Sequence, residues 1–206
     1  MNQPAVDAAN RDPEGRARLS PTLASLVVIL LTSCGFARIA SAVKAEDPDS
    51  PEAIVSAFYE ICIEEKVTGL PTEAQFEELG PLLSESLHSL LADARMEQAE
   101  FSRENPYEKP PWVEGDLFSS LFEGPTRFTA EKAVIEGKRA TVTVSFVDDS
   151  PGNEKPFTWK DDVMLVRNSD GSWRIDDVVY RGNWDFASKG KLSDALSPGE
   201  SSDEEE

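Results

Sequence analysis

The feature that most constrains the fold is a change in hydrophobic period near Gly124. Before it, apolar residues recur at three- and four-residue spacing, which is typical of amphipathic helices. After it, apolar and polar side chains alternate one by one, most clearly over residues 139–147, which predicts strands with one buried face. Helices followed by an antiparallel meander indicate an α+β fold.

The first half predicts three helices. The first, over residues 51–66, follows Ser50 as an N-cap and starts with proline, which suits the first helical position. A short second helix is expected over 72–79 and a longer one over 84–103, before an irregular proline-containing loop at 105–112. The predicted buried stripes of the first and third helices are Ile54, Ala57, Phe58, Ile61 and Cys62, and Leu87, Leu90, Leu91, Ala94, Gln98 and Phe101.

The second half predicts four strands, at 126–136, 139–147, 157–167 and 172–181. Asp170-Gly171 is a strong signal for a hairpin turn between the last two. Residues 192–196 fit either a short closing helix or a last edge segment. We expect the apolar side of the sheet to close over the helices.

The N-terminal region has the pattern of a targeting segment. Arginines flank a stretch from Leu19 to Ala37 that carries no charge, as in a secretory signal. Three outcomes stay open: a bacterial lipoprotein box with lipidation at Cys34, cleavage after Ala42, or an uncleaved anchor. Each exports the rest of the chain, as a lipoprotein or a soluble periplasmic protein of the bacterial cell envelope.

The chain of 206 residues therefore divides into four parts. Residues 1–33 (alternatively 1–42) are the signal segment, 34–49 a linker, 50–198 the α+β domain and 199–206 an acidic tail that is expected to be disordered.

The net charge and the content of cysteine and histidine limit which partners, disulfides and cofactors are expected. The net charge of −19 repels phosphate backbones and anionic headgroups, so nucleic acid is not expected, and membrane contact is expected only through a lipid or signal anchor. Only Cys34 and Cys62 are present, and lipidation uses Cys34 while cleavage after Ala42 removes it, so we expect no internal disulfide. Cys62 is expected to be a small buried hydrophobe. With a single histidine and no nucleotide-binding motif, neither a metal nor a cofactor is expected.

A family resemblance rests on the order of several segments. These are "SPEAIVSAFYEICI", "LLSESLHSLLADARMEQAEF", "DLFSSLFEGPTRF", "RATVTVSF" and "WKDDVMLVRNSDGSWRIDDVVY". Across residues 50–196 the chain resembles a bacterial family of exported proteins of unknown function, placed among the nuclear-transport-factor-2-like, cystatin-like proteins. The resemblance implies a cone-shaped sheet wrapped round a long helix with a pocket between them. It implies no activity.

Three residues are candidates for catalysis. Strand parity places Asp177 with Trp173 and Ile175, and a carboxylate between apolar walls has the raised pKa of a general base. Asp161 has the same parity on the preceding strand and is predicted to meet it across the sheet, while His88 is a third candidate. The competing interpretation is that both aspartates bind loop amides or pair with arginines at positions 139, 174 or 181.

Tyr59 and Trp112 are the candidates for ligand binding, and core packing is the alternative for both. The leading hypothesis is an exported, non-catalytic module that binds a small ligand or a protein partner, with a possible homodimer through the sheet face. The alternatives are an isomerase- or hydratase-like enzyme that uses pocket carboxylates, and an immunity or inhibitor protein.

Overall fold

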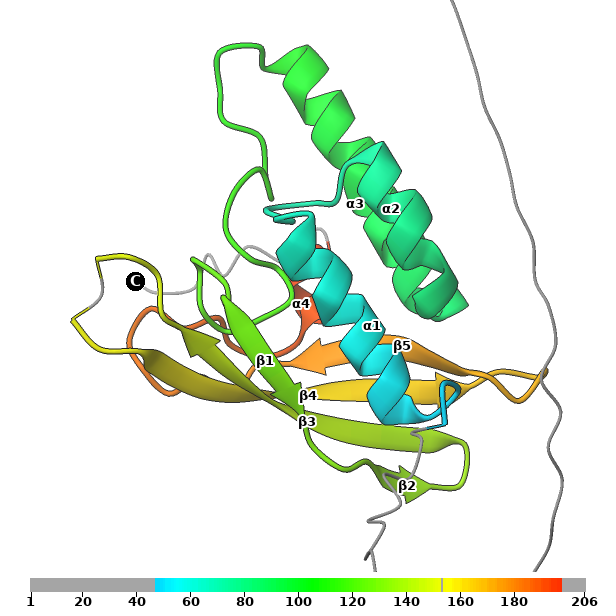
Figure 1. Cartoon of the computed structure of the whole chain (residues 1–206). Coiled ribbons are helices and arrows are strands. Elements are labelled where there is room, and N and C mark those ends of the chain that lie inside the picture. The colour runs from blue at the N-terminus through cyan, green and yellow to red at the C-terminus, as the bar shows by residue number, and fades with distance from the viewer. Residues whose placement is uncertain (1–46, 153, 198–206) are drawn as a thin grey trace, which may run out of the picture. The chain divides into compact units, whose positions relative to one another are not determined.

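The helices begin and end close to where the sequence predicts. The structure, a computed structural model, describes residues 47–152 and 154–197 (Figure 1). The helical half consists of α1 (Pro51–Glu64), α2 (Glu73–Leu79), a 3-10 turn η1 (Gly80–Leu82) and α3 (Glu85–Glu104).

Side-chain caps fix these helix starts. The Ser50 hydroxyl accepts a hydrogen bond from the Ala53 N–H at 3.2 Å, and Ser84 does the same for Leu87 at 3.1 Å. At α2, the N-cap Thr72 forms a reciprocal capping box with the third helical residue. Each cap satisfies N–H groups that have no partner inside the helix.

The second half forms one open antiparallel sheet. Its strands are β1 (Arg127–Ala130), β2 (Val134–Glu136), β3 (Arg139–Asp148), β4 (Phe157–Arg167) and β5 (Trp173–Val179). The order across the sheet is β1-β3-β4-β5, and β2 also pairs with β3. The α+β class predicted from the change in period is confirmed.

The predicted single strand over 126–136 is wrong, because it is two short strands. The interval from Ala130 to Val134 is one residue longer than the interval opposite it on β3, so the ladder cannot continue in register. The interruption is held by a side chain instead, since the Ala133 N–H donates to the Glu52 carboxylate on α1 at 2.8 Å.

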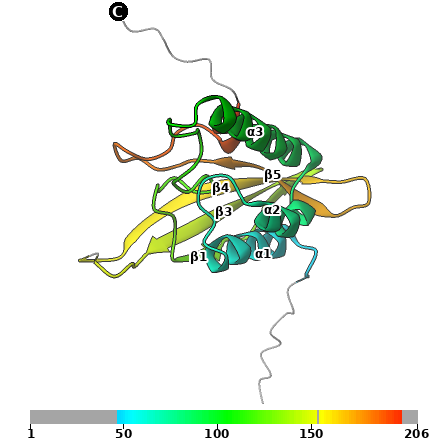
Figure 2. The same cartoon turned by 90° about the horizontal axis from the view of Figure 1, so that it is seen from above.

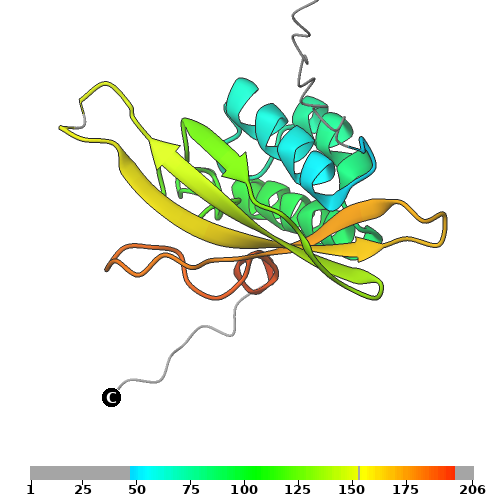
Figure 3. The same cartoon turned by 60° about the horizontal axis from the view of Figure 1, so that its bottom comes forward.

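The helices α1, α2 and α3 cover one face of the sheet (Figures 1 and 2). Figure 3 shows the opposite face, on which none of these three helices lies. The short segment at 192–196 is a helix, α4 (Leu192–Leu196), which contacts α3 and β5 and buries both of its leucines in the core.

Aromatic rings fill the space between α1 and the sheet. Phe58 and Tyr59 of α1 are both buried, and each meets a further ring edge to face, Phe118 and Phe146 respectively. The buried face of α1 is therefore centred on Val55, Phe58 and Tyr59, while the predicted Ile54, Ile61 and Cys62 are only half-buried. The buried residues of α3, Leu87, Leu91 and Ala94, all belong to its predicted stripe.

Several predictions concern residues outside the described ranges. These are the signal segment, the lipidation of Cys34, most of the linker and the acidic tail. Within residues 47–152 and 154–197, no helix has the length and apolar composition needed to cross a bilayer.

Packing of α3 on the core can be tested at two positions of the same helix. Leu91 is fully buried, whereas Met96 is 66% exposed. We expect Leu91→Ala to lower the free energy of unfolding by about 3 kcal/mol, because it leaves a cavity, and Met96→Ala to change it by about 0.5 kcal/mol or less. Urea unfolding measures both, and equal losses would contradict the observed packing.

Candidate functional site

Asp161 is a buried structural anchor. It lies on the core side of β4, as its parity predicts, and is fully inaccessible to solvent. Its carboxylate accepts hydrogen bonds from the Ser120 N–H (2.7 Å) and hydroxyl, from the Arg181 N–H (2.7 Å) and from the Trp159 indole N–H (3.2 Å). Four donors leave this carboxylate no free lone pair for a substrate.

Asp177 does not lie where strand parity predicts. The register between β4 and β5 shifts after Ile175, so Asp176 is an extra residue in the strand. This β-bulge reverses the alternation, and Val178 rather than Val179 is buried with Ile175. Asp177 consequently lies on the other side of the strand from its predicted apolar neighbours.

Asp177 instead holds the start of α4. Its carboxylate accepts hydrogen bonds from the Ser193 N–H at 3.1 Å and hydroxyl at 2.7 Å, and the Lys191 ammonium lies 4.0 Å away. The predicted meeting of Asp161 and Asp177 is therefore not found, since each is held by its own donors. The competing interpretation, in which the aspartates accept hydrogen bonds from backbone amides of other segments, therefore describes both residues.

His88 and Trp112 serve the packing of other elements. His88 is exposed on α3 and its ring lies 4.5 Å from that of Phe76 on α2. The half-buried Trp112 donates its indole N–H to the Ala195 carbonyl at 2.8 Å and so ties the loop after α3 to α4.

Tyr59, by contrast, lines a cavity of about 520 Å³. The cavity lies between the last turns of α1, with Cys62 and Ile63, and the segment 116–126. Tyr59 is held rigidly in its wall, because its hydroxyl donates to the Phe118 carbonyl at 2.8 Å. A hollow of this size suits a small molecule.

Asp116 is the polar group of the inner wall. Its carboxylate accepts a hydrogen bond from the Phe118 N–H at 2.6 Å and one from the Ser119 hydroxyl at 3.2 Å. Gly124 approaches so closely that a methyl group there would lie 2.7 Å from this carboxylate, and its φ of +74° also favours glycine. The two charged side chains that line the cavity besides Asp116 are Lys66 and Glu123.

Burial raises the pKa values of two groups in the wall of the cavity. Burial raises the pKa of Asp116 from 3.8 to about 6, an effect that the Phe118 and Ser119 hydrogen bonds only partly offset. Burial and the nearby Asp116 likewise raise the pKa of Cys62 well above its usual value, which keeps the thiol protonated. Near neutral pH, Asp116 thus exchanges between a carboxylate and a carboxylic acid that donates a hydrogen bond.

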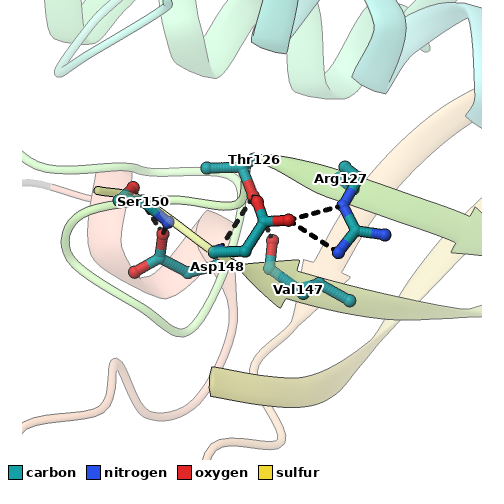
Figure 4. Close-up of polar contacts among 6 residues, drawn as sticks. Thr126, Arg127, Val147, Asp148 and Ser150 are labelled. Carbon is teal, nitrogen blue, oxygen red and sulfur yellow. Dashed lines mark hydrogen bonds and ion pairs between the residues drawn. The ribbon is translucent and has the colours of Figure 1, made fainter. Parts of the chain in front are cut away.

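The rim of the cavity is tied to the β3–β4 connection. Thr126 donates from its N–H to the Val147 carbonyl at 2.9 Å, and its hydroxyl contacts Asp149. Asp149 also pairs with Arg127, at 2.7 Å from a guanidinium nitrogen, and Figure 4 shows this cluster. These contacts hold the end of the 116–126 segment against the sheet.

Sequence reasoning missed Asp116, the central polar residue of this cavity. A signal was present in "DLFSSLF", residues 116–122, where an acid and two serines stand among four apolar residues just before a Gly-Pro pair. An acid followed by a serine three positions later is typical of a local side-chain cap of backbone N–H groups. The sequence does not indicate that this turn faces the end of α1.

Comparison with known proteins gives no further assignment: the chain matches no protein-family model and no curated protein. Within the described part of the chain, no three His, Cys, Asp or Glu side chains are grouped so that they could hold a metal ion.

The anchoring role of Asp161 predicts a large loss of stability on its removal. We expect Asp161→Ala to lower the free energy of unfolding by about 3–5 kcal/mol, because it leaves buried donors without an acceptor. The half-exposed Asp176 on the neighbouring strand provides the control, and Asp176→Ala should cost about 0.5 kcal/mol or less. Similar losses in denaturant unfolding would contradict the anchoring role.

The raised pKa of Asp116 predicts a pH-dependent stability. Because its pKa in the folded state exceeds 3.8, this group favours folding below pH 3.8 and loses that contribution as the pH rises through about 6. Relative to the wild-type protein, Asp116→Asn should therefore gain about 1–3 kcal/mol between pH 4 and pH 7.5, the lower values reflecting screening by cavity water. Urea unfolding at the two pH values measures this change, and a pH-independent difference would contradict it.

Proposed function

We propose that this protein is an exported cell-envelope module that binds a small ligand in the cavity between α1 and the segment 116–126, without catalysing a reaction. The observation that carries the proposal is the cavity itself, which is large enough for a small molecule and has a carboxyl group in its inner wall. Most ligand sites in proteins combine an apolar lining with a few placed polar groups.

The lining favours a ligand that is mostly apolar and carries a hydrogen-bonding group. Tyr59, Ile63 and Val67 supply apolar surface, and Asp116 faces the ligand with a carboxyl group that either accepts or donates a hydrogen bond near neutral pH. The charges of Lys66 and Glu123 oppose each other, so the remaining charge of the lining is that of Asp116, which is mostly ionised above its pKa of about 6.

We further propose that the domain has the cone-shaped, nuclear-transport-factor-2-like form and that residues 1–33 or 1–42 direct its export. Helices on one face of an antiparallel sheet, with a hollow beside the first helix, support the fold assignment. The homodimer through the sheet face and the inhibitor hypothesis stay predictions.

A second candidate function is acid–base catalysis in the same cavity. It is favoured by the pKa of about 6 for Asp116, which suits a group that takes up and releases protons near neutral pH. This assigns the enzymatic role to Asp116 and not to Asp161 or Asp177, whose carboxylates hold other segments of the fold by hydrogen bonds. Retained ligand binding in Asp116→Asn with loss of turnover would favour this candidate.

Filling the cavity tests the binding function. We expect Cys62→Phe to occupy the hollow with its ring while the folded structure persists, because the thiol is half-buried in an apolar wall that faces open space. A fragment library of small aromatic acids, amides and amines, screened by NMR, should give hits that shift the Tyr59 and Asp116 signals in the wild-type protein and fail to bind Cys62→Phe.

The matched control is Met96→Phe, which adds a ring at an exposed position of α3. Hits that persist in Cys62→Phe would contradict the proposal, as would a screen in which no fragment shifts Tyr59 or Asp116. Circular dichroism of each variant shows whether it is folded.

A further inference from the structure

A second hollow is lined in part by the segment 121–126. It is a groove of about 610 Å³ between Leu121 and Glu123, the start of β4 and Trp184. The β3–β4 connection, which bounds this groove, extends beyond the rest of the sheet (Figures 1 and 3). Of the residues that line the cavity next to α1, only Glu123 also lines this groove.

Aromatic rings form one side of the groove. Phe157 and Trp184 meet at an interplanar angle of 88° with their ring centres 5.0 Å apart, which leaves a corner between two ring systems. Phe157 is 40% exposed, although apolar rings of this size are usually buried. The buried Trp159 packs against both rings, with its ring centre 5.8 Å from that of Phe157 and 6.3 Å from that of Trp184.

The rest of the lining is acidic. Two exposed carboxylates, those of Glu123 and Glu154, line it with the single ammonium group of Lys155, while the buried Asp148 already accepts hydrogen bonds from Ser150. Among the described residues, neither Glu123 nor Glu154 has an ion-pair partner. The chain as a whole carries a net charge of −19, so the surrounding field adds to the local one.

Aromatic faces beside carboxylates form a chemical combination that favours organic cations. The ring quadrupole attracts a positive charge above the ring face, and substituted ammonium groups, which are only weakly hydrated, benefit most. Carboxylates add attraction over a longer range, and an anion or a phosphate would be repelled.

We propose that the groove formed by Leu121, Glu123, Glu154, Phe157 and Trp184 binds a small organic cation that carries a substituted ammonium group. The ammonium group lies in the corner between Phe157 and Trp184, and Glu123 and Glu154 balance its charge. This site is separate from the cavity of the proposed function and does not depend on it.

The test uses choline and its uncharged isostere 3,3-dimethylbutan-1-ol as probes. Each is titrated into the full-length chain while the indole N–H signal of Trp184 is followed by NMR. We expect choline to shift this signal with saturation and to bind at least about tenfold more tightly than the alcohol, because only choline has the charge that the rings and carboxylates attract. Raising the salt concentration should weaken choline binding.

Two variants test the residues, each with a matched control. Phe157→Leu should raise the dissociation constant of choline about fivefold or more, whereas Tyr107→Leu, at a ring that is 99% exposed in the loop after α3, should leave it unchanged. Glu154→Gln should raise it about threefold, whereas Glu77→Gln, at an exposed position of α2, should not. Glu154 is exposed, and Glu154→Gln keeps the shape of the side chain, so this variant tests the groove even if Phe157→Leu disturbs folding.

Several results would overturn the proposal. The proposal fails if choline gives no saturable shift of the Trp184 signal, or if the alcohol binds as tightly as choline. It also fails if Glu154→Gln and Glu77→Gln weaken choline binding equally, because that would show only a diffuse attraction by the net charge. Binding of tetralysine in the absence of choline binding would also overturn it, because the groove would then fit a basic protein partner. Choline binding should persist in Cys62→Phe, so failure of the groove proposal can be distinguished from failure of the proposed ligand cavity.

Discussion

The hydrogen bonds between Asp161 and Ser120 are the interaction on which this end of the molecule depends. The segment 105–126 has little regular structure, so its backbone must be fixed by contacts outside itself. Ser120 binds the Asp161 carboxylate through both its N–H and its hydroxyl, accepts a hydrogen bond from the Gly182 N–H at 3.0 Å, and accepts another from the Ser188 N–H at 3.0 Å. One buried carboxylate on β4 thereby joins the segment before the sheet to the segment after it.

The segment 105–126 also carries Asp116, whose carboxylate lies in a different environment from that of Asp161. Asp161 has four donors and no access to solvent, so its charge is fully compensated by fixed dipoles. Asp116 accepts only from Phe118 and Ser119 and borders a cavity, and its pKa rises to about 6. Asp116 also caps the Phe118 N–H, but its carboxylate has fewer donors than that of Asp161 and borders a hollow, and this is the physical reason to propose a ligand contact for Asp116 and a structural role for Asp161.

The regular elements could be read from the sequence because their signals are local. N-caps at Ser50 and Ser84, and the alternation over 139–147, place helices and strands without knowledge of the tertiary structure. The bulge at Asp176 could not be foreseen in this way, because it depends on how β5 meets β4, and the sequence alone does not reveal whether Val178 or Val179 is buried. The site was missed for the same reason: residues 62 and 116 are far apart in the sequence and become neighbours only when the irregular segment folds back over α1.

Charge separates the two hollows by the ligands that we propose for each. In the cavity beside α1, Lys66 opposes Glu123, and the charge of Asp116 is lost only as the pH falls through about 6. Apolar surface and hydrogen-bonding groups make up the rest of this lining. In the groove beside Trp184, carboxylates outnumber the single ammonium group and aromatic rings are exposed, so attraction of a cation dominates. Because Glu123 borders both hollows and Leu121 lines the groove, the Asp161–Ser120 anchor, which fixes the residue before them, bears on both proposed sites.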